Sequence, residues 1–439
     1  MIWTCGTYQF DTHTPTIMGV LNMTPDSFSD GGLHPDTETA LGHARQMVAQ
    51  GARIIDVGGE STRPGAEPVT PDEEWNRVGA VIRQLAAEDV CVSVDTRHAE
   101  VAARAVEAGA SIVNDVSGFR DPAMVRVAAG ADVGVVVMHM QGEPATMQDD
   151  PHYDDVVAEV CAYLGEQAAM LEAAGVARSR ICVDPGPGFG KTQSQTVELM
   201  RNRHEVRHLG YPVMCAVSRK SFITSAYQLD PEDLLARDAA SANEALLAAE
   251  LGASVIRTHN VEATAQALKA LKPYVLLSLG SNVALVAEPG EETEAKEAQI
   301  NLAIGKLCQL PDSLLIDVAP FYLSRAAYKE DQDDFVNTAV LLRTGLPPRE
   351  LLQCLHAIED MLGRVRTEPN GPRTLDIDIV DYQMYSYATD DLVLPHPRAI
   401  ERDFVVRPSE DILPGHVLAD GRRMAELPAE KRLGAAERL

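Results

Sequence analysis

The sequence predicts an α/β TIM (β/α)8 barrel followed by a smaller α+β ferredoxin-like domain, and three observations lead to this fold class. The length of 439 residues exceeds that of one ordinary domain. From residue 16 to residue 259, short apolar runs alternate with Ala-rich amphipathic segments of helical length, which is typical of βα units around a parallel sheet. After residue 272 the order of elements changes to βαββαβ. We therefore place the barrel in residues 1–272 and the second domain in residues 273–439.

Short apolar runs supply the predicted barrel strands, because they are too brief for helices. They span residues 16–21, 53–57, 90–94, 111–113, 133–138, 180–183, 212–217 and 254–256. Eight βα units in about 250 residues match a TIM barrel, whose active site lies at the carboxyl ends of its strands.

Polar side chains stand at the carboxyl end of every one of these runs. In order they are Asn22, Asp56, Asp95, Asn114 with Asp115, His139, Asp184, Ser218 with Lys220, and Arg257 with His259. Their number and chemistry indicate one shared pocket, since strand ends of a barrel meet at one face. Most strands end in amides and carboxylates, whereas the last two end in cations. This arrangement suits a ligand with a hydrogen-bonding heterocycle at one end and an anion at the other. Asp56 could equally brace the loop that carries Thr62. Asp115 and His139 are expected either to cap strand ends or to support the substrate-binding residues without touching the substrate.

The loop after the second run has a further chemical signature. Gly58 and Gly59 open it, and Thr62, Arg63 and Pro64 follow. A hydroxyl, a guanidinium and a residue of fixed φ together suit the binding of an oxyanion at a defined place.

The second domain has its chemical centre in a predicted strand around residues 375–380. Residues two apart face one side of a strand, so Asp376 and Asp378 present two carboxylates to one point. Paired carboxylates near arginines suit Mg²⁺ bound to substrate phosphates. The other expected elements are strands at 274–279, 314–318 and 335–342 and helices at about 298–310 and from Pro347 to Gly363. The acidic segment 287–297 is expected to be a solvated loop or a frayed helix start.

Composition excludes several kinds of partner. The formal net charge is −27, which argues against nucleic acid or an anionic membrane surface. The seven cysteines form no Cys-x-x-Cys pair, which favours buried free thiols in a reducing compartment. The N-terminus lacks a basic region followed by an apolar core, and no apolar run reaches about 18 residues. A soluble, cytoplasmic protein is expected.

Four motifs of the first part resemble dihydropteroate synthase. They are the stretch from Gly19 to Gly32, Asp56 to Gly65, Asp184 to Lys191 and Ser218 to Ser221. This resemblance implies condensation of 6-hydroxymethyl-7,8-dihydropterin diphosphate with p-aminobenzoate. It also implies a homodimer formed through the barrel, with small molecules as the other partners.

The same resemblance implies roles for individual residues. The pterin would be held by Asp95, Asn114, Asp184 and Lys220, and the diphosphate by Asn22, Arg63, Arg257 and His259, with Asn22 also reaching Mg²⁺. The p-aminobenzoate site would be lined by Thr62, Pro64, Phe189 and Ser218.

Residues 274–414 resemble 6-hydroxymethyl-7,8-dihydropterin pyrophosphokinase through the stretch from Gly371 to Val380 and through Pro395-His396-Pro397-Arg398. Ser324-Arg325-Ala326 stands where that family usually has Thr-Pro-Pro. The resemblance implies transfer of diphosphate from ATP to the pterin alcohol. It makes Asp376 and Asp378 Mg²⁺ ligands. Around the ATP phosphates it implies Arg364, Arg366, Arg373, His396 and Arg402, and near pterin or nucleotide it implies Asn337, Phe404 and Glu359.

Two alternatives remain beside a bifunctional folate-pathway enzyme. The second domain could be a silent binding or regulatory module on an active synthase, although both Asp376 and Asp378 are present. The barrel could instead be a pterin-binding methyl-transfer enzyme, which has no reason to carry Thr62-Arg63-Pro64.

Overall fold

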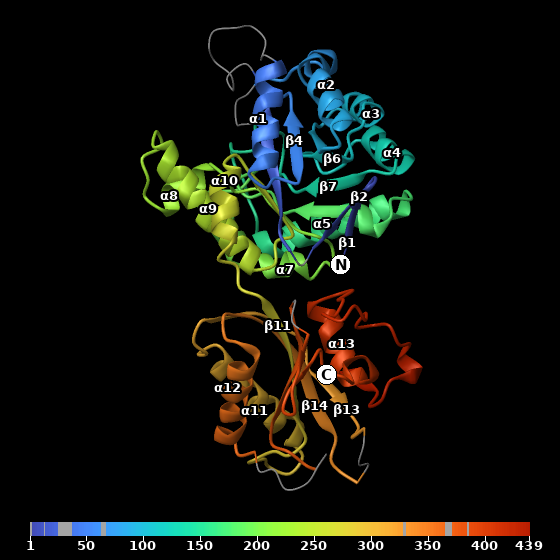
Figure 1. The fold of residues 1–439 in the computed structure, drawn as a ribbon, viewed down its shortest axis with the longest axis vertical. Helices are drawn as coiled ribbons and strands as arrows, with labels where there is room; N and C mark the ends of the chain where they lie inside the picture. The colour runs from blue at the N-terminus through green and yellow to red at the C-terminus, as the bar shows by residue number, and fades with distance from the viewer. Residues whose placement is uncertain are drawn as a thin grey trace. The chain divides into compact units, whose positions relative to one another are not determined.

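The computed structural model describes residues 2–12, 14–24, 37–62, 67–327, 331–364, 371–383 and 386–439. The chain divides into two compact units, Met1–Leu271 and Lys272–Leu439 (Figure 1).

The first unit is built on an eight-stranded parallel sheet, which confirms the predicted barrel strands. Its strands are β3 (Thr16–Asn22), β4 (Ile54–Gly58), β5 (Cys91–Asp95), β6 (Ile112–Asp115), β7 (Gly134–Met138), β8 (Ile181–Asp184), β9 (Met214–Cys215) and β10 (Val255–Thr258). Neighbours follow the order β8-β7-β6-β5-β4-β3-β10-β9. A parallel bridge from Val183 to Val213 joins the last edge to the first, so the sheet closes into a barrel.

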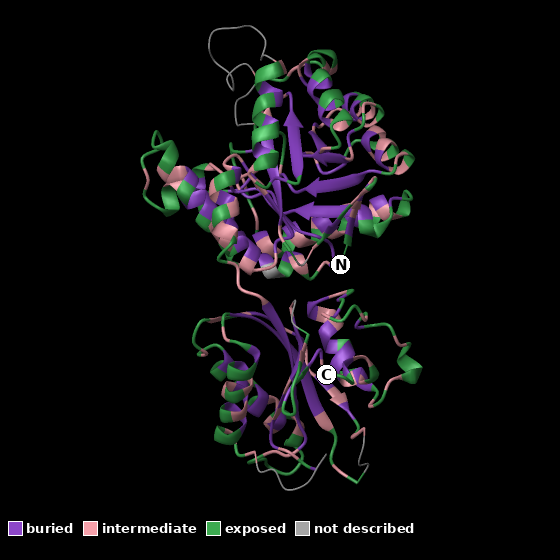
Figure 2. Cartoon of the chain, viewed as in Figure 1, coloured by how far each residue is buried: buried purple, intermediate pink, exposed green. Residues whose placement is uncertain are grey.

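Helices surround this barrel and bury one face against it. They are α1 (Thr37–Ala49), α2 (Pro71–Ala87), α3 (Ala99–Glu107), α4 (Pro122–Gly130), α5 (Val156–Ala173), α6 (Gln193–Arg201), α7 (Arg203–Arg207), α8 (Ser221–Ala226), α9 (Leu234–Glu250) and α10 (Val261–Leu268). Figure 2 shows buried strands inside and exposed residues on the outer helix faces. Side-chain caps fix several helix starts, since Thr70 accepts from Glu73 N and Asp155 from Val157 N.

A short hairpin packs against the inner residues of the barrel. Its strands are β1 (Ile2–Cys5) and β2 (Tyr8–Asp11). Trp3, Cys5 and Phe10 form one buried cluster with residues near the amino ends of the barrel strands, among them Met18 and Ile54. The Trp3 indole also donates to the Arg180 carbonyl at 2.9 Å. The hairpin therefore closes the barrel at the end opposite to the predicted active site.

The second unit confirms the ferredoxin-like α+β prediction. Its main elements are β11 (Tyr274–Ser281), α11 (Glu292–Leu307), β12 (Ser313–Val318), β14 (Phe335–Thr344), α12 (Pro348–Met361) and β15 (Asp376–Tyr382). Strands β15, β11, β14 and β12 pair antiparallel in that order. Helix α11 begins at Glu292, earlier than expected, because glutamates in a first turn are favoured by the helix dipole.

The second unit also holds elements that the sequence did not predict. They are β13 (Tyr322–Ser324), β16 (Tyr387–Ala388), β17 (Val393–Leu394), α13 (Asp403–Ile412) and β18 (Ala436–Arg438). Helices α11 and α12 cover one face of the sheet and α13 covers the other (Figure 1). Strands β13 and β18 extend the sheet beside β14.

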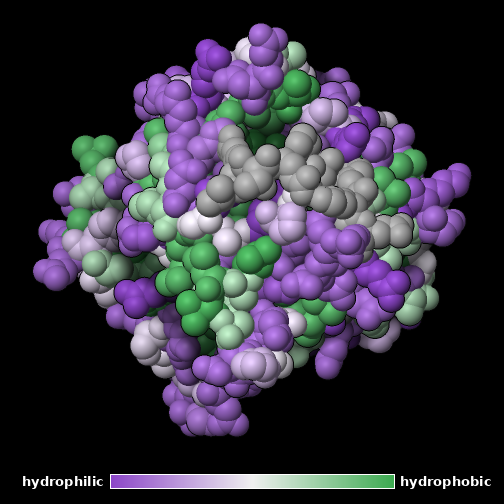
Figure 3. Space-filling view, turned by 90° about the horizontal axis from the view of Figure 1, so that it is seen from below, coloured by the Kyte–Doolittle hydropathy of each residue, from purple (hydrophilic) through white to green (hydrophobic). Residues whose placement is uncertain are grey.

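The face drawn in Figure 3 is mostly hydrophilic, with hydrophobic areas between the polar ones. Within the ranges that the structure describes, no helix combines the length and apolar character needed to cross a membrane. All seven cysteines are free, and Cys5, Cys91, Cys182 and Cys215 are buried as predicted, whereas Cys308 is exposed.

Candidate active sites

The predicted polar residues meet in one layer at the carboxyl end of the barrel. Strand register places Asn22 beside Gly58, Gly58 beside Asp95, and Asp95 beside Asn114. Asp184 ends β8 beside Met138 of β7. The side chains thus come from neighbouring strands that end at the same face, as the sequence predicted.

Arg257 lies at the centre of this layer between two aspartates. Its Nε donates to Asp56 Oδ2 at 2.6 Å and its Nη2 to Asp95 Oδ2 at 2.7 Å. Asn114 Nδ2 donates to the same Asp56 oxygen at 3.2 Å. Asp56 is fully buried, and within the described residues it accepts hydrogen bonds from Arg257 and Asn114. Asp56 therefore orients the arginine and the amide of the pocket.

Four buried oxygens of this layer have no hydrogen-bond partner within the described residues. They are Asp56 Oδ1, Asp95 Oδ1, Asn114 Oδ1 and Asp184 Oδ2. Buried acceptors without donors are costly, so they mark a place where a ligand would be stabilised by donating hydrogen bonds. The barrel mouth is thus chemically suited to a group that is rich in N–H donors.

Burial dominates the electrostatics of the same residues. Burial raises the pKa of Asp95 to about 7. The positive charge of Arg257 opposes this rise, and the negative charge of Asp56 adds to it. Burial also raises the pKa of Asp184, and it lowers the pKa of Lys220 to about 8. The pKa of Arg257 is raised, because Asp56 and Asp95 outweigh its desolvation. Protonation of this pocket is therefore sensitive to whatever charge or donor enters it.

Lys220, Phe189, Ser218 and His259 form the adjoining wall. The Lys220 ammonium donates to the Pro187 carbonyl at 2.6 Å and lies 4.6 Å from the centre of the Phe189 ring. Ser218 Oγ accepts from His259 N at 3.1 Å and lies 3.1 Å from His259 Nδ1. The predicted residues of the last three strand ends are thus brought together.

Lys191 and His139, which are not among the predicted substrate-binding residues, support the loop after β8. Lys191 is almost fully buried, and its ammonium donates to the carbonyls of Gly186 at 3.0 Å and Phe189 at 3.1 Å. It also lies 2.8 Å from Nδ1 of His139. Burial first, and then Lys191, lowers the pKa of His139 to about 3. His139 is therefore a neutral partner of Lys191, while Asp115 caps a turn through Ser117 N and Phe119 N, as expected.

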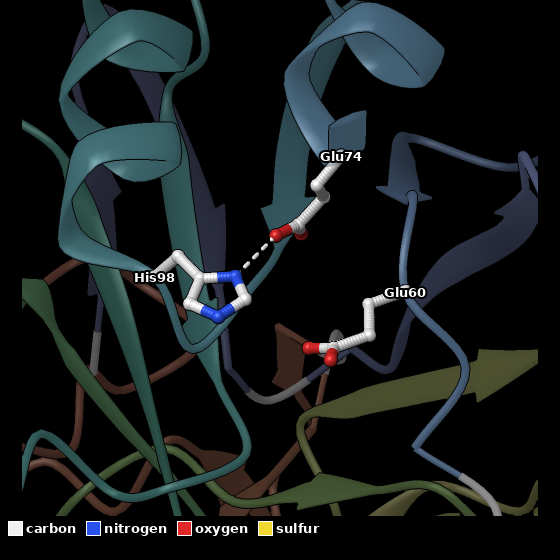
Figure 4. Close-up of side chains that lie close together, drawn as sticks. All are labelled: Glu60, Glu74 and His98. Atoms are coloured by element: carbon white, nitrogen blue, oxygen red, sulfur yellow. Dashed lines mark hydrogen bonds and ion pairs between the residues drawn. The ribbon is translucent and has the colours of Figure 1, made fainter. Parts of the chain in front are cut away.

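The base of the Thr62 loop is fixed by a cluster of charged residues. Glu60 Oε2 and Oε1 accept from Arg97 Nε and Nη2 at 2.9 and 3.0 Å. Beside them, His98 Nδ1 lies 2.7 Å from Glu74 Oε2 (Figure 4). The potential metal-ligating atoms of Glu60, Glu74 and His98 lie within 4.8 Å of one another. Glu60 is already paired with the guanidinium of Arg97, which occupies the place of a cation. Thr62 is half-buried, whereas Arg63 and Pro64 lie outside the described residues.

The second unit has a pocket of about 610 Å³, including its open mouth. Of the predicted residues it brings together Asn337, Arg373, Asp376, Asp378, Arg402 and Phe404. Ser324, Arg325 and Ala326, where the sequence departs from the resembled family, also line it. The volume lies within the range of ordinary small-molecule sites.

Arginines pair with the two aspartates of this pocket. Arg402 Nη1 lies 3.2 Å from Asp378 Oδ2, and Arg364 Nη2 lies 2.7 Å from Asp376 Oδ1. Arg373 also forms an ion pair with Asp376. Burial and the neighbouring Asp376 raise the pKa of Asp378 to about 6. A second cation near these oxygens would therefore be favourable, which fits the predicted metal ligands.

The remaining predicted residues of this domain lie outside the pocket wall or the described chain. Glu359 is buried and accepts from Ile377 N at 2.8 Å and from Arg364, so it supports β15. His396 Nδ1 accepts from Arg398 N at 3.1 Å, and burial lowers its pKa to about 4. Arg366 lies outside the described residues.

Comparison with known proteins agrees with this division. Residues 18–259 match the family model of pterin binding enzymes, and residues 276–414 match that of 7,8-dihydro-6-hydroxymethylpterin-pyrophosphokinase. A dihydropteroate synthase of Neisseria meningitidis is 46% identical over 274 residues, which cover 61% of this chain and 96% of the relative. That of Escherichia coli is 43% identical over 263 residues, covering 60% and 92%.

Solved structures of the same enzyme share the fold of the first unit. The Yersinia pestis dihydropteroate synthase in a sulfonamide drug complex has a TM-score of 0.58 at 39% identity, covering 61% of this chain and 97% of that one. The Burkholderia cenocepacia enzyme complexed with 7,8-dihydropteroate has a TM-score of 0.56 at 40% identity, covering 61% and 94%. The chain belongs to the pterin binding enzyme family, as a dihydropteroate synthase joined to a pyrophosphokinase domain.

Proposed function

We propose that this chain performs two consecutive steps of folate biosynthesis. Residues 273–439 transfer diphosphate from ATP to 6-hydroxymethyl-7,8-dihydropterin and release AMP. Residues 1–272 condense the resulting pterin diphosphate with p-aminobenzoate and release diphosphate. The observation that carries the second step is the set of four unpartnered buried acceptors at the barrel mouth.

A dihydropterin has the donors that these acceptors require. Its amino group and ring N–H groups lie side by side on one edge, next to a carbonyl. Asp95, Asn114 and Asp184 accept from that edge, and Lys220 supplies a cation for the remaining acceptor atoms. Because the pocket is buried, each hydrogen bond replaces a desolvation penalty, which favours the pterin over ligands without such donors.

Condensation then depends on positioning and on the leaving group. The amine nitrogen of p-aminobenzoate attacks the methylene carbon of the pterin. The carbon–oxygen bond breaks, its electron pair leaves with diphosphate, and the amine loses a proton. The amine needs little activation, so Arg257, His259, Arg63 and Asn22 act by stabilising the charge on diphosphate. Thr62, Pro64, Phe189 and Ser218 orient p-aminobenzoate.

In the second unit the oxygen of the pterin hydroxyl attacks the β-phosphorus of ATP. The bond from the β-phosphorus to the oxygen that bridges to the α-phosphate breaks, AMP leaves with its electron pair, and the hydroxyl loses its proton. Phe404 and Asn337 hold the pterin against the pocket wall, while Arg373 and Arg402 neutralise phosphate oxygens. Asp376 and Asp378 are hard oxygen ligands on one strand face, so they fit Mg²⁺. When bound there, or near Asn22 in the barrel, Mg²⁺ neutralises phosphate charge. Arg364, Arg366 and His396 support ATP binding, and Glu359 acts through its ion pair with Arg364.

The assembly and location of the protein are also proposals. We propose a homodimer formed through the barrel, supported by Leu234 and Leu235 of α9, which are 48% and 81% exposed. A cytoplasmic location fits the absence of disulfides among its seven free cysteines. Light scattering of the purified chain tests the dimer, since a monomer mass at micromolar concentration would contradict it.

One experiment tests both steps. Purified full-length chain receives ATP, Mg²⁺ and 6-hydroxymethyl-7,8-dihydropterin, and AMP is measured. In a second reaction, supplied pterin diphosphate and p-aminobenzoate are used, and dihydropteroate is measured. Asp376→Ala is expected to abolish AMP formation and to leave the second reaction unchanged. Dihydropteroate without AMP from the unaltered chain would leave a synthase with a silent second domain.

A further inference from the structure

The backbone between Ser218 and Lys220 has an unusual conformation. Arg219 has a φ of 60° in the loop after β9. This left-handed region is unfavourable for a residue with a long side chain, because its Cβ approaches the following carbonyl. Such a conformation persists only where the surrounding structure holds it in place.

Helix α9 binds Arg219 through its backbone N–H, its carbonyl and its guanidinium. Its backbone N–H donates to Ser241 Oγ at 3.0 Å, and its carbonyl accepts from Arg237 Nη2 at 2.7 Å. Its guanidinium donates to the two carboxylate oxygens of Asp238 at 2.6 and 2.8 Å. Asp238 is 6% exposed, and the bonds from Arg219 and Asn260 outweigh burial and lower its pKa. The carboxylate is therefore a charged, rigid anchor for this loop.

The same carboxylate also holds the next loop of the barrel. Asn260 Nδ2 donates to Asp238 Oδ2 at 3.0 Å, and Asn260 Oδ1 caps α10 by accepting from Ala263 N at 3.0 Å. Asn260 directly follows His259, whose backbone N–H donates to Ser218 Oγ. Asp238 therefore joins the loop after β9 to the loop after β10, although it lies outside the layer of substrate-binding residues.

We propose that Asp238 is a positioning residue for the condensation. Through Arg219 and Asn260 it keeps Ser218 and Lys220 in register with His259. The inference rests on the roles proposed above for these three residues. A reacting amine must meet the methylene carbon within a narrow geometry, and a shift of about 1 Å can cost on the order of a hundredfold in rate.

Asp238→Asn is the informative variant because it keeps the size of the side chain. Its amide offers only one acceptor oxygen, and its NH2 group faces an arginine that can only donate. At least one of the three bonds from Arg219 and Asn260 is lost. We expect the KM for p-aminobenzoate to rise about tenfold or more and kcat to fall, as measured by dihydropteroate formation in the full-length chain. AMP formation by the second unit is expected to stay unchanged.

The split between KM and kcat separates positioning from a loss of folded protein. KM reports only on active molecules. Partial unfolding therefore lowers the apparent kcat and leaves the KM for p-aminobenzoate and the KM for pterin diphosphate unchanged. That result, or no change at all, would overturn the inference. If Asp238→Asn does not fold, Ser241→Ala removes only the bond to Arg219 N, and a rise in the same KM is still expected. Unchanged KM in a folded Ser241→Ala would then overturn it.

Two further variants complete the test. Glu88→Gln changes another carboxylate that binds an arginine through two bonds, from Arg45 at 2.9 and 2.6 Å, and is expected to leave both KM values unchanged. Arg219→Lys loses the two-pronged contact, and its effect should not add to that of Asp238→Asn, because both act through one interaction. Additive effects would contradict the inference. An inactive unaltered chain would instead overturn the proposed function, and the inference with it.

Discussion

Asp95→Asn is expected to make the barrel more stable and less active at the same time. Burial raises the pKa of Asp95 from 3.8 to about 7 in the fold, and this value already includes the attraction of Arg257. Ionising this buried carboxyl therefore destabilises the fold, by an amount on the order of a few kcal/mol, since each tenfold change in proton affinity corresponds to about 1.4 kcal/mol. An asparagine resembles the protonated carboxyl in shape and lack of charge, so the variant avoids this penalty.

The sign of the pH dependence follows from the raised pKa. Between about pH 4 and pH 7 the folded state keeps a proton that the unfolded chain has lost, so the stability of the unaltered chain falls as pH rises. Asp95→Asn lacks this slope. The variant should therefore be nearly as stable as the unaltered chain at pH 4 and more stable above pH 7, by on the order of a few kcal/mol.

Urea unfolding followed by tryptophan emission measures this difference in the full-length chain. The two tryptophans, Trp3 and Trp75, both lie in the first unit, so the signal reports on the barrel alone. Asp154→Asn is the matched control, since its carboxylate is fully exposed. Equal or lower stability of Asp95→Asn at pH 8, or a gain that does not shrink toward pH 4, would refute the reasoning. Condensation should fall about ten- to a hundredfold, because a charged acceptor for the pterin is lost.

Three further predictions concern other contacts. Lys191→Met should raise the KM for pterin diphosphate about tenfold, because the carbonyls of the loop after Asp184 lose their shared donor; an unchanged KM in steady-state assays would contradict this. Glu60→Gln should raise the KM for p-aminobenzoate by a few fold, because the ion pair with Arg97 that fixes the base of the Thr62 loop is lost. A change in the KM for pterin diphosphate alone would argue against this role. A chelator should stop AMP formation and added Mg²⁺ should restore it; continued activity in the chelator would exclude the metal role of Asp376 and Asp378.

The barrel strands could be predicted because each is a short run buried on both faces. The predicted ends differ by one or two residues, and β10 continues through Arg257 to Thr258 although its apolar run ends at Ile256. The sequence pattern cannot show that a polar residue at a strand end still pairs in the sheet. The β1 and β2 strands were missed because four residues are too few for a periodic pattern.

The chemistry of the site could be predicted from strand ends, but its pairings could not. Asp56 and Arg257 are 201 residues apart, and only the pairing of β10 with β3 places β4 and β10 on the two sides of β3. Asp238 was not predicted because it lies within a helix, where a polar residue is usually solvated. Its buried position depends on how α9 packs against the loops after β9 and β10, which no local pattern encodes.

The two pockets differ in how their polar groups are paired before substrate binds. Within the described residues, the barrel mouth holds four buried acceptor atoms without a donor, so it favours a heterocycle with N–H groups. In the second pocket Arg373 and Arg402 are each paired with an aspartate. When phosphate and Mg²⁺ bind together, phosphate can pair with the arginines and Mg²⁺ with the aspartates, so that no buried charge loses its partner. Phosphate without the metal would leave Asp378 without Arg402 and Asp376 with Arg364 as its remaining arginine. ATP binding in this pocket should therefore be strongly coupled to Mg²⁺.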